Sequence, residues 1–65
     1  MSPDELSESQ WIDRFVARLA SKLPALRPIE AIVRAHRAYA EAADWDPSEL
    51  AERLADAETA AARPH

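Results

Sequence analysis

Hydrophobic residues recur at three- and four-residue spacing along most of this 65-residue chain. The first such segment contains Trp11, Ile12, Phe15, Val16, Leu19 and Leu23. Because an α-helix turns about 100° per residue, this spacing places them on one face. Ser7 and Gln10 fit a capping box, and Pro24 cannot continue a helix. The pattern predicts a helix over Ser7–Leu23.

A second helix is predicted over Pro28–Ala43, and we expect the other two helices to pack on it. Its main apolar stripe, which we expect in the core, consists of Ile29, Ile32, Val33, Tyr39, Ala40 and Ala43, with His36 in the middle. A charged stripe consists of Glu30, Arg34, Arg37 and Glu41. A third stripe has only small residues, Ala31, Ala35, Ala38 and Ala42. These alanines either raise helix propensity on a solvent face or form a seam for close packing of another helix.

A third helix is predicted over Pro47–Ala61. Asp46 fits the cap, Pro47 the first helical position and Glu49 the reciprocal partner of the cap, while Trp45 and Leu50 fit a hydrophobic staple. Helix capping therefore explains this acidic cluster, and a calcium loop would need a glycine at its sharp turn. The buried side would hold only Leu50, Leu54 and the alanines Ala51, Ala55 and Ala61, so we expect the least stable helix of the three.

These segments predict an all-α fold, a small three-helix domain over residues 7–61, with flexible ends at residues 1–6 and 62–65. The short connector between the first two helices predicts an antiparallel hairpin, with the third helix folded across it or across a second subunit. A single core of this size rarely supplies more than ~3–5 kcal/mol. We therefore expect a homo-oligomer or a larger protein partner to bury further apolar surface.

The charges follow an acid–base–acid order, with a net charge of −4. Residues 1–13 carry four acids and no base, residues 14–37 six bases and one acid, and residues 38–62 seven acids and one base. This order predicts that the ends fold back over the middle; the alternative is that the basic middle meets an acidic partner. The abundant alanine and the excess of arginine over lysine are typical of bacteria with GC-rich genomes.

The first residues are acidic and lack the apolar segment of a signal peptide. No apolar run approaches the ~20 residues of a membrane span. We therefore expect a soluble, cytoplasmic protein that does not enter a membrane.

Residues that carry chemistry are scarce. The chain has no cysteine and no glycine, which excludes disulfides, thiolate metal sites and glycine-rich phosphate loops. We expect no enzymatic activity, no metal and no cofactor. His36 either fills space in the core with one hydrogen bond or, because imidazole titrates near neutrality, acts as a proton carrier or a pH-sensitive interface residue.

The function that fits best is a small helical protein–protein interaction module, an accessory or adaptor subunit that self-associates. The residues expected to anchor its core or interface are Trp11, Phe15, Ile32, His36, Tyr39 and Trp45. The alternative is a helix-turn-helix-like regulator that binds nucleic acid through Arg27, Arg34 and Arg37. The net negative charge and the glutamates interleaved with these arginines make nucleic acid the less favoured partner.

Overall fold

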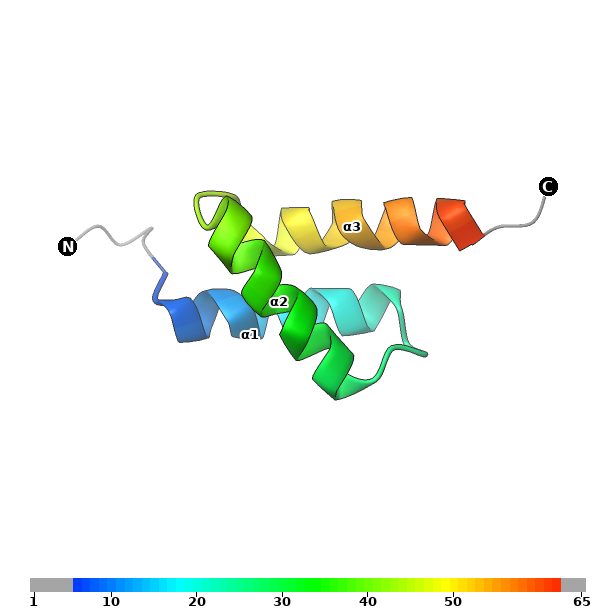
Figure 1. The fold of residues 1–65 in the computed structure, drawn as a ribbon, viewed down its shortest axis with the longest axis horizontal. Coiled ribbons are helices and arrows are strands. Elements are labelled where there is room, and N and C mark those ends of the chain that lie inside the picture. Colours follow the sequence, from blue (N-terminus) through cyan, green and yellow to red (C-terminus); the bar gives the residue numbers. More distant parts are fainter. Residues whose placement is uncertain (1–5, 63–65) are drawn as a thin grey trace.

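A computed structural model describes residues 6–62, which form three α-helices and no strand (Figure 1). Helix α1 spans Glu8–Lys22, α2 spans Pro28–Ala42 and α3 spans Pro47–Ala62. The predicted all-α, three-helix fold is confirmed, with each helix end within one residue of its expected position. The ends expected to be flexible lie, apart from Leu6 and Ala62, outside the described residues. Leu6 is partly buried against the core, and Ala62 is the last residue of α3.

The beginning of α1 has the predicted cap. The Ser7 hydroxyl accepts a hydrogen bond from the Gln10 N–H at 3.2 Å, and the Gln10 side chain accepts one from the Ser7 N–H at 3.1 Å. The last residue of α1 is Lys22, its C-cap Leu23 stands directly before Pro24, and α2 begins with Pro28. Local sequence chemistry therefore determines these boundaries, because caps and prolines act over a single turn.

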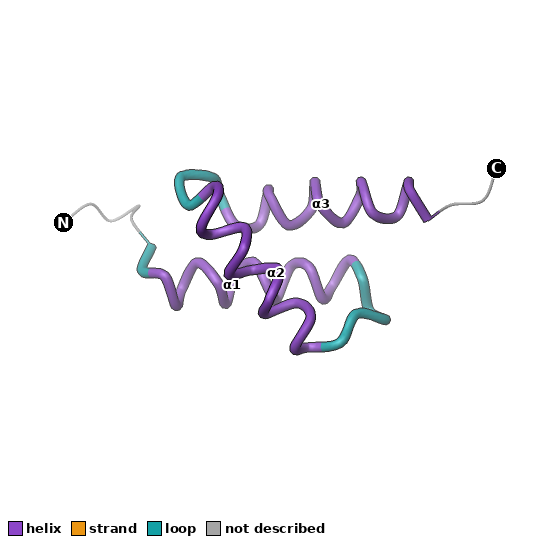
Figure 2. The backbone as a smooth tube through the Cα atoms, viewed as in Figure 1, coloured by secondary structure: helices purple, strands orange, loops and turns teal. Residues whose placement is uncertain are grey.

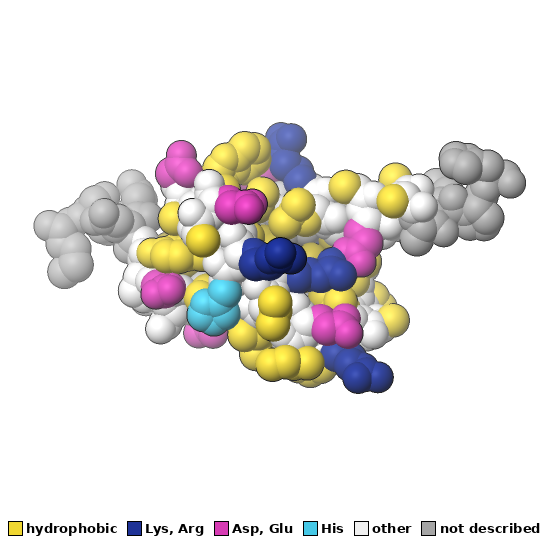
Figure 3. Space-filling model, in the orientation of Figure 1, with side chains coloured by type: hydrophobic (Ala, Val, Ile, Leu, Met, Phe, Trp, Pro, Cys, Tyr) yellow, Lys and Arg dark blue, Asp and Glu magenta, His cyan; other side chains and the backbone are white. Residues whose placement is uncertain are grey.

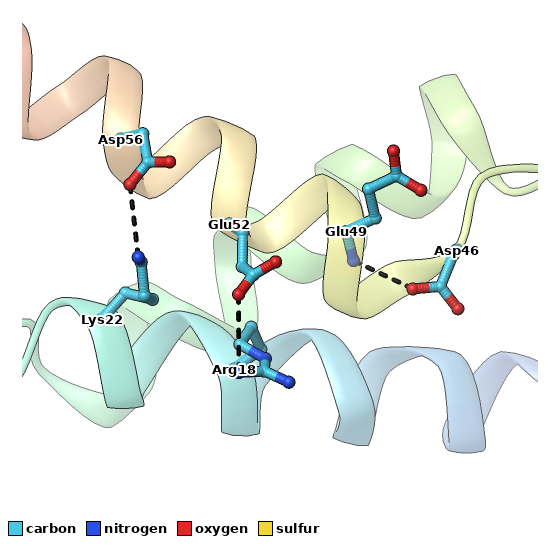
Figure 4. Close-up of polar contacts among 6 residues, drawn as sticks. All are labelled: Arg18, Lys22, Asp46, Glu49, Glu52 and Asp56. Atoms are coloured by element: carbon cyan, nitrogen blue, oxygen red, sulfur yellow. Dashed lines mark hydrogen bonds and ion pairs between the residues drawn. The ribbon is translucent and has the colours of Figure 1, made fainter.

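The cap of α3 is confirmed in one half and wrong in the other. The Asp46 carboxylate accepts a hydrogen bond from the Glu49 N–H at 2.9 Å (Figure 4). The Glu49 carboxylate does not return the bond to the Asp46 N–H. It accepts instead from Arg53, one turn further along α3, at 3.3 Å. The side-chain cap of Asp46 and the proline at the first helical position, Pro47, therefore fix the start of this helix.

Helix α1, not α2, is the centre of the domain, since both other helices pack against it. Helix α2 crosses in front of α1 at an oblique angle, and α3 runs alongside α1 in the same direction (Figures 1 and 2). The expected contact between the first two helices is confirmed, but α2 crosses α1 obliquely instead of forming an antiparallel hairpin with it, and α3 lies along α1 instead of across the pair. The helix that lies across the others is α2.

The core combines bulky side chains from one helix with alanines from the other two. Helix α1 buries Trp11, Ile12, Phe15 and Leu19, and the rings of Trp11 and Phe15 stack with centroids 5.4 Å apart. The buried positions of α2 are Ala31, Ala35 and Ala38, and α3 adds Pro47, Ala51 and Ala55. Small residues on α2 and α3 let their backbones approach α1 closely, so its large side chains fill the space between the helices.

The face of α2 expected in the core lies on the surface instead. The exposed fractions are 63% for Ile29, 40% for Ile32 and 52% for Val33. Trp45 and Leu54, also expected in the core, are 44% and 43% exposed, and Ala61 is exposed as well. The physical reason is that only one face of α2 can pack against α1. Because α1 already fills the space between the helices with large side chains, the face of small alanines fits there and the isoleucine and valine face does not.

Two ion pairs join α3 to α1. Arg18 lies 3.5 Å from Glu52, and Lys22 lies 3.4 Å from Asp56 (Figure 4). They confirm that the acidic third segment folds back onto the basic middle of the chain. Because all four side chains are partly exposed to water, the pairs orient α3 more than they stabilise it.

Within the described residues, no helix combines the length and the apolar composition needed to cross a membrane.

Candidate interaction surface

The side of α2 that faces away from α1 carries an unusual concentration of exposed aliphatic side chains. We call it the outer face of α2, consisting of Ile29, Ile32, Val33, His36 and Ala40. At about 100° per residue these positions lie opposite the buried alanines. Figure 3 looks onto this side and shows hydrophobic side chains gathered over the first half of α2, with charged residues around them. Branched aliphatic residues grouped on a monomer surface mark contact sites more often than isolated ones do.

A shallow hollow of about 270 Å³ lies along one edge of the outer face. It is lined by Ile29, Glu30, Val33, Arg34 and Arg37. When two helices pack, a side chain of one enters a hole formed by positions i, i+3, i+4 and i+7 of the other. Glu30, Val33, Arg34 and Arg37 have this spacing. The hollow therefore has the form of a socket for a side chain from another helix.

Arg34 connects α2 to α3 through Glu58. The guanidinium donates two hydrogen bonds to this carboxylate, and the Nη2–Oε1 distance is 3.0 Å. These hydrogen bonds, aided by the positive charge of Arg34, hold the pKa of Glu58 below its ordinary value of 4.5, while partial loss of water acts in the opposite direction. The same contacts raise the pKa of Arg34, to which the nearby Glu30 also contributes.

Acid should weaken the link between α2 and α3. Because the pKa of Glu58 is lower in the folded state, its contribution to stability is present above pH 4.5 and disappears as the pH falls through the lowered pKa. We expect Glu58→Gln to reduce the loss of melting temperature between about pH 5 and pH 3, measured by circular dichroism. Asp13→Asn is the matched control, because Asp13 forms no ion pair among the described residues; an equal effect of both variants would contradict this assignment.

A groove of about 480 Å³ separates α2 from α3 beside this ion pair. Phe15, Leu19 and Ala38 line its apolar part together with Leu54. Arg37 and Glu41 line it from α2. Phe15 and Leu19 are already fully buried there, so Leu54 is the one large apolar side chain of the groove that is exposed.

Aromatic side chains gather where α1 meets the connection between α2 and α3. The Trp11 indole N–H donates a hydrogen bond to the Trp45 carbonyl at 3.0 Å, and the Tyr39 ring meets Trp11 edge-on with centroids 5.4 Å apart. The Trp45 ring itself is partly exposed, with the Arg53 guanidinium 5.5 Å from its centroid. This cluster anchors the beginning of α3 to α1, and the hydrogen bond satisfies the one polar group of a buried indole.

The structure divides the predicted anchor residues between core and surface. Trp11 and Phe15 are buried, and Tyr39 is partly buried. Ile32 and His36 lie together on the outer face of α2, and the expectation that His36 fills space in the core is wrong. The alanine stripe is the packing seam of α2 on α1, where Ala31, Ala35 and Ala38 are buried and Ala42 is partly buried.

The structure brings two of the three arginines of the nucleic-acid hypothesis together: Arg34 and Arg37 line the same hollow, and Arg27 does not line it. Arg34 is held by Glu58, whereas Arg27 and Arg37 are exposed. Arg27 precedes the first turn of α2, and Arg37 lies beyond its middle. The sequence does not indicate Glu30 as a site residue, although it lines the same hollow as Arg37 at the edge of the outer face.

Within residues 6–62, no three carboxylate or imidazole side chains lie close enough together to hold a metal ion. Comparison of this chain with protein-family models, with curated proteins and with solved structures finds no match.

Proposed function

We propose that this protein is a small helical interaction module that self-associates through the outer face of α2. The observation that carries the proposal is the exposure of Ile29, Ile32 and Val33 on one side of a helix whose other side is buried. Leaving such side chains in water forgoes the free energy of burial, about 25 cal/mol for each Å² of apolar surface. A second helix laid along this face would recover it.

The thin core supports the same proposal. Alanines provide five of the nine residues in the buried hydrophobic cluster, so α2 and α3 bury little apolar surface of their own. Small domains bury a low fraction of their surface on folding. Association therefore increases the stability of such a domain, because it buries further apolar surface of chains that are already folded.

Val33→Asp is expected to weaken self-association at least about tenfold, because it would place a carboxylate in the apolar centre of the contact. The measurement is sedimentation equilibrium from about 10 µM to about 1 mM, the range of weak and moderate affinities. The melting temperature of the dilute protein should change little, since the Val33 side chain is already half in water.

Leu54→Asp serves as the control, because Leu54 is an exposed aliphatic residue on α3, away from the outer face of α2. It should leave the association constant unchanged. A protein that stays monomeric up to about 1 mM would contradict self-association, and loss of association in Leu54→Asp alone would place the contact at the groove between α2 and α3.

A further inference from the structure

Two residues of opposite charge, Glu30 and Arg37, lie along the edge of the outer face of α2 that carries the hollow. Both are exposed, and neither forms an ion pair within residues 6–62. Arg34 lies between them but is paired with Glu58. Reversing the direction of the helix places each positive charge where a negative one was, so this edge is complementary to an antiparallel copy of itself.

We propose that the partner on this face is a second copy of the chain, docked with its α2 antiparallel to the first about a two-fold axis level with Val33 and Arg34. This inference rests on the proposed self-association and adds its orientation and its specificity. In this arrangement Glu30 faces Arg37 of the second copy, and Arg37 faces its Glu30.

The helix dimensions fit this register. Glu30 and Arg37 are seven residues apart, about 10.5 Å along the axis at 1.5 Å per residue, and the midpoint between them falls level with Val33 and Arg34. A two-fold axis at that level therefore aligns both charge pairs at once. In a parallel dimer the two-fold axis would run along the helices. The edge with Glu30 and Arg37 would then face the opposite edge of the second copy, where Ile32 lies, and Glu30 would not meet Arg37.

The apolar residues fit the same axis. Val33 of the second copy lies level with the hollow formed by Glu30, Val33, Arg34 and Arg37, which has the geometry of a knob-into-hole contact. Ile29 lies level with the gap between His36 and Ala40 of the second copy, where the small alanine leaves room. Arg34 comes close to the axis without repelling its copy, because Glu58 of the same chain neutralises it.

Charge reversal tests the orientation. Glu30→Arg places arginine opposite Arg37 of the second copy, and Arg37→Glu places glutamate opposite its Glu30. Because each homodimer exchanges two attractive pairs for two repulsive ones, we expect each variant to dimerise about tenfold more weakly at low salt. An equal mixture of the two variants should form a heterodimer, and the double variant Glu30→Arg/Arg37→Glu should dimerise like the original protein.

Net charge alone predicts a different result. Glu30→Arg changes the net charge from −4 to −2 and would strengthen association if general repulsion were the main effect, whereas Arg37→Glu changes it to −6 and would weaken it. Specific pairing weakens both. Asp13→Arg makes the same change of charge as Glu30→Arg on the solvent side of α1, and it should not weaken dimerisation.

The outcomes separate the two proposals. Circular dichroism of each dilute variant establishes that it is folded, and sedimentation equilibrium then gives the dimer constant. Loss of association in Val33→Asp with no effect of the charge reversals, or without heterodimer formation in the mixture, would overturn the antiparallel pairing and leave self-association through α2 intact. A monomeric original protein, or association that is insensitive to Val33→Asp, would overturn both.

Discussion

Phe15→Ala should leave the domain largely unfolded at room temperature. Phe15 is fully buried, it stacks on Trp11, and it belongs to the group of bulky side chains that fills the core from α1. Truncation of a buried phenylalanine to alanine typically costs about 3–5 kcal/mol, because the cavity closes only in part. A single core in a domain this small rarely supplies more than ~3–5 kcal/mol in total, so the loss is comparable to the whole stability.

Far-UV circular dichroism during thermal and denaturant unfolding measures this effect. Phe15→Leu retains most of the volume, so it should remain folded with a lower melting temperature and give a measurable free energy of unfolding. Val33→Ala is the control, since it truncates an exposed aliphatic residue of α2 and should leave the melting temperature of the dilute protein almost unchanged. A Phe15→Ala variant that melts like the original protein would contradict the placement of Phe15 in the core.

Ala35→Leu should destabilise the domain by about 1–3 kcal/mol, the usual cost of inserting a larger side chain into a well-packed core. Ala35 is fully buried at the seam between α2 and α1, where the backbones approach closely. A leucine there must push the two helices apart or adopt a strained rotamer. Leucine and alanine have similar helix propensities, so a loss of stability would come from packing and not from α2 itself.

The matched control is Ala57→Leu, which makes the same change at an exposed position of α3. Denaturant unfolding of both variants gives their free energies of unfolding, and only Ala35→Leu should lower this value substantially. If Ala35→Leu were as stable as Ala57→Leu, the alanine seam would not be the packing face of α2.

The helix boundaries could be predicted because they depend on chemistry within one turn. Ser7, Asp46 and Pro28 each act on neighbouring backbone groups, whatever the rest of the chain does. The bulky face of α1 was equally clear, since its aliphatic and aromatic positions keep one period over four turns. These features fix the number of helices and their ends.

The buried face of α2 could not be predicted from hydrophobicity, because isoleucine and valine exceed alanine on every such measure. Burial depends on the helix that α2 meets, and α1 fills the space between them with Phe15 and Leu19. The useful signal was spacing: Ala31, Ala35 and Ala38 keep an unbroken packing period, and Ala51 and Ala55 begin the same pattern in α3. A face of small residues opposite a bulky helix is a packing surface.

The candidate interaction surface could not be predicted for the same reason, namely that the alanine face of α2 is buried in place of its isoleucine and valine face. The sequence alone does not decide whether Ile32 and His36 lie in the core or at an interface, since one helical stripe can serve either. Because the alanines occupy the seam, the outer face lies on the surface, with Glu30 and Arg37 exposed at its edge.

The core takes its large side chains from α1 and its small ones from α2 and α3, and this arrangement affects how much the sequence of the fold can vary. In the described part of the chain, nine residues form the buried hydrophobic cluster, four large ones on α1 and five alanines on α2 and α3. Exposed positions that belong neither to this cluster nor to the residues packed on it nor to the helix caps can change without altering how the helices fit together. Homologous domains can therefore share this fold at very low sequence identity. The regular spacing of alanines on the second and third helices would be the sequence pattern by which to recognise them.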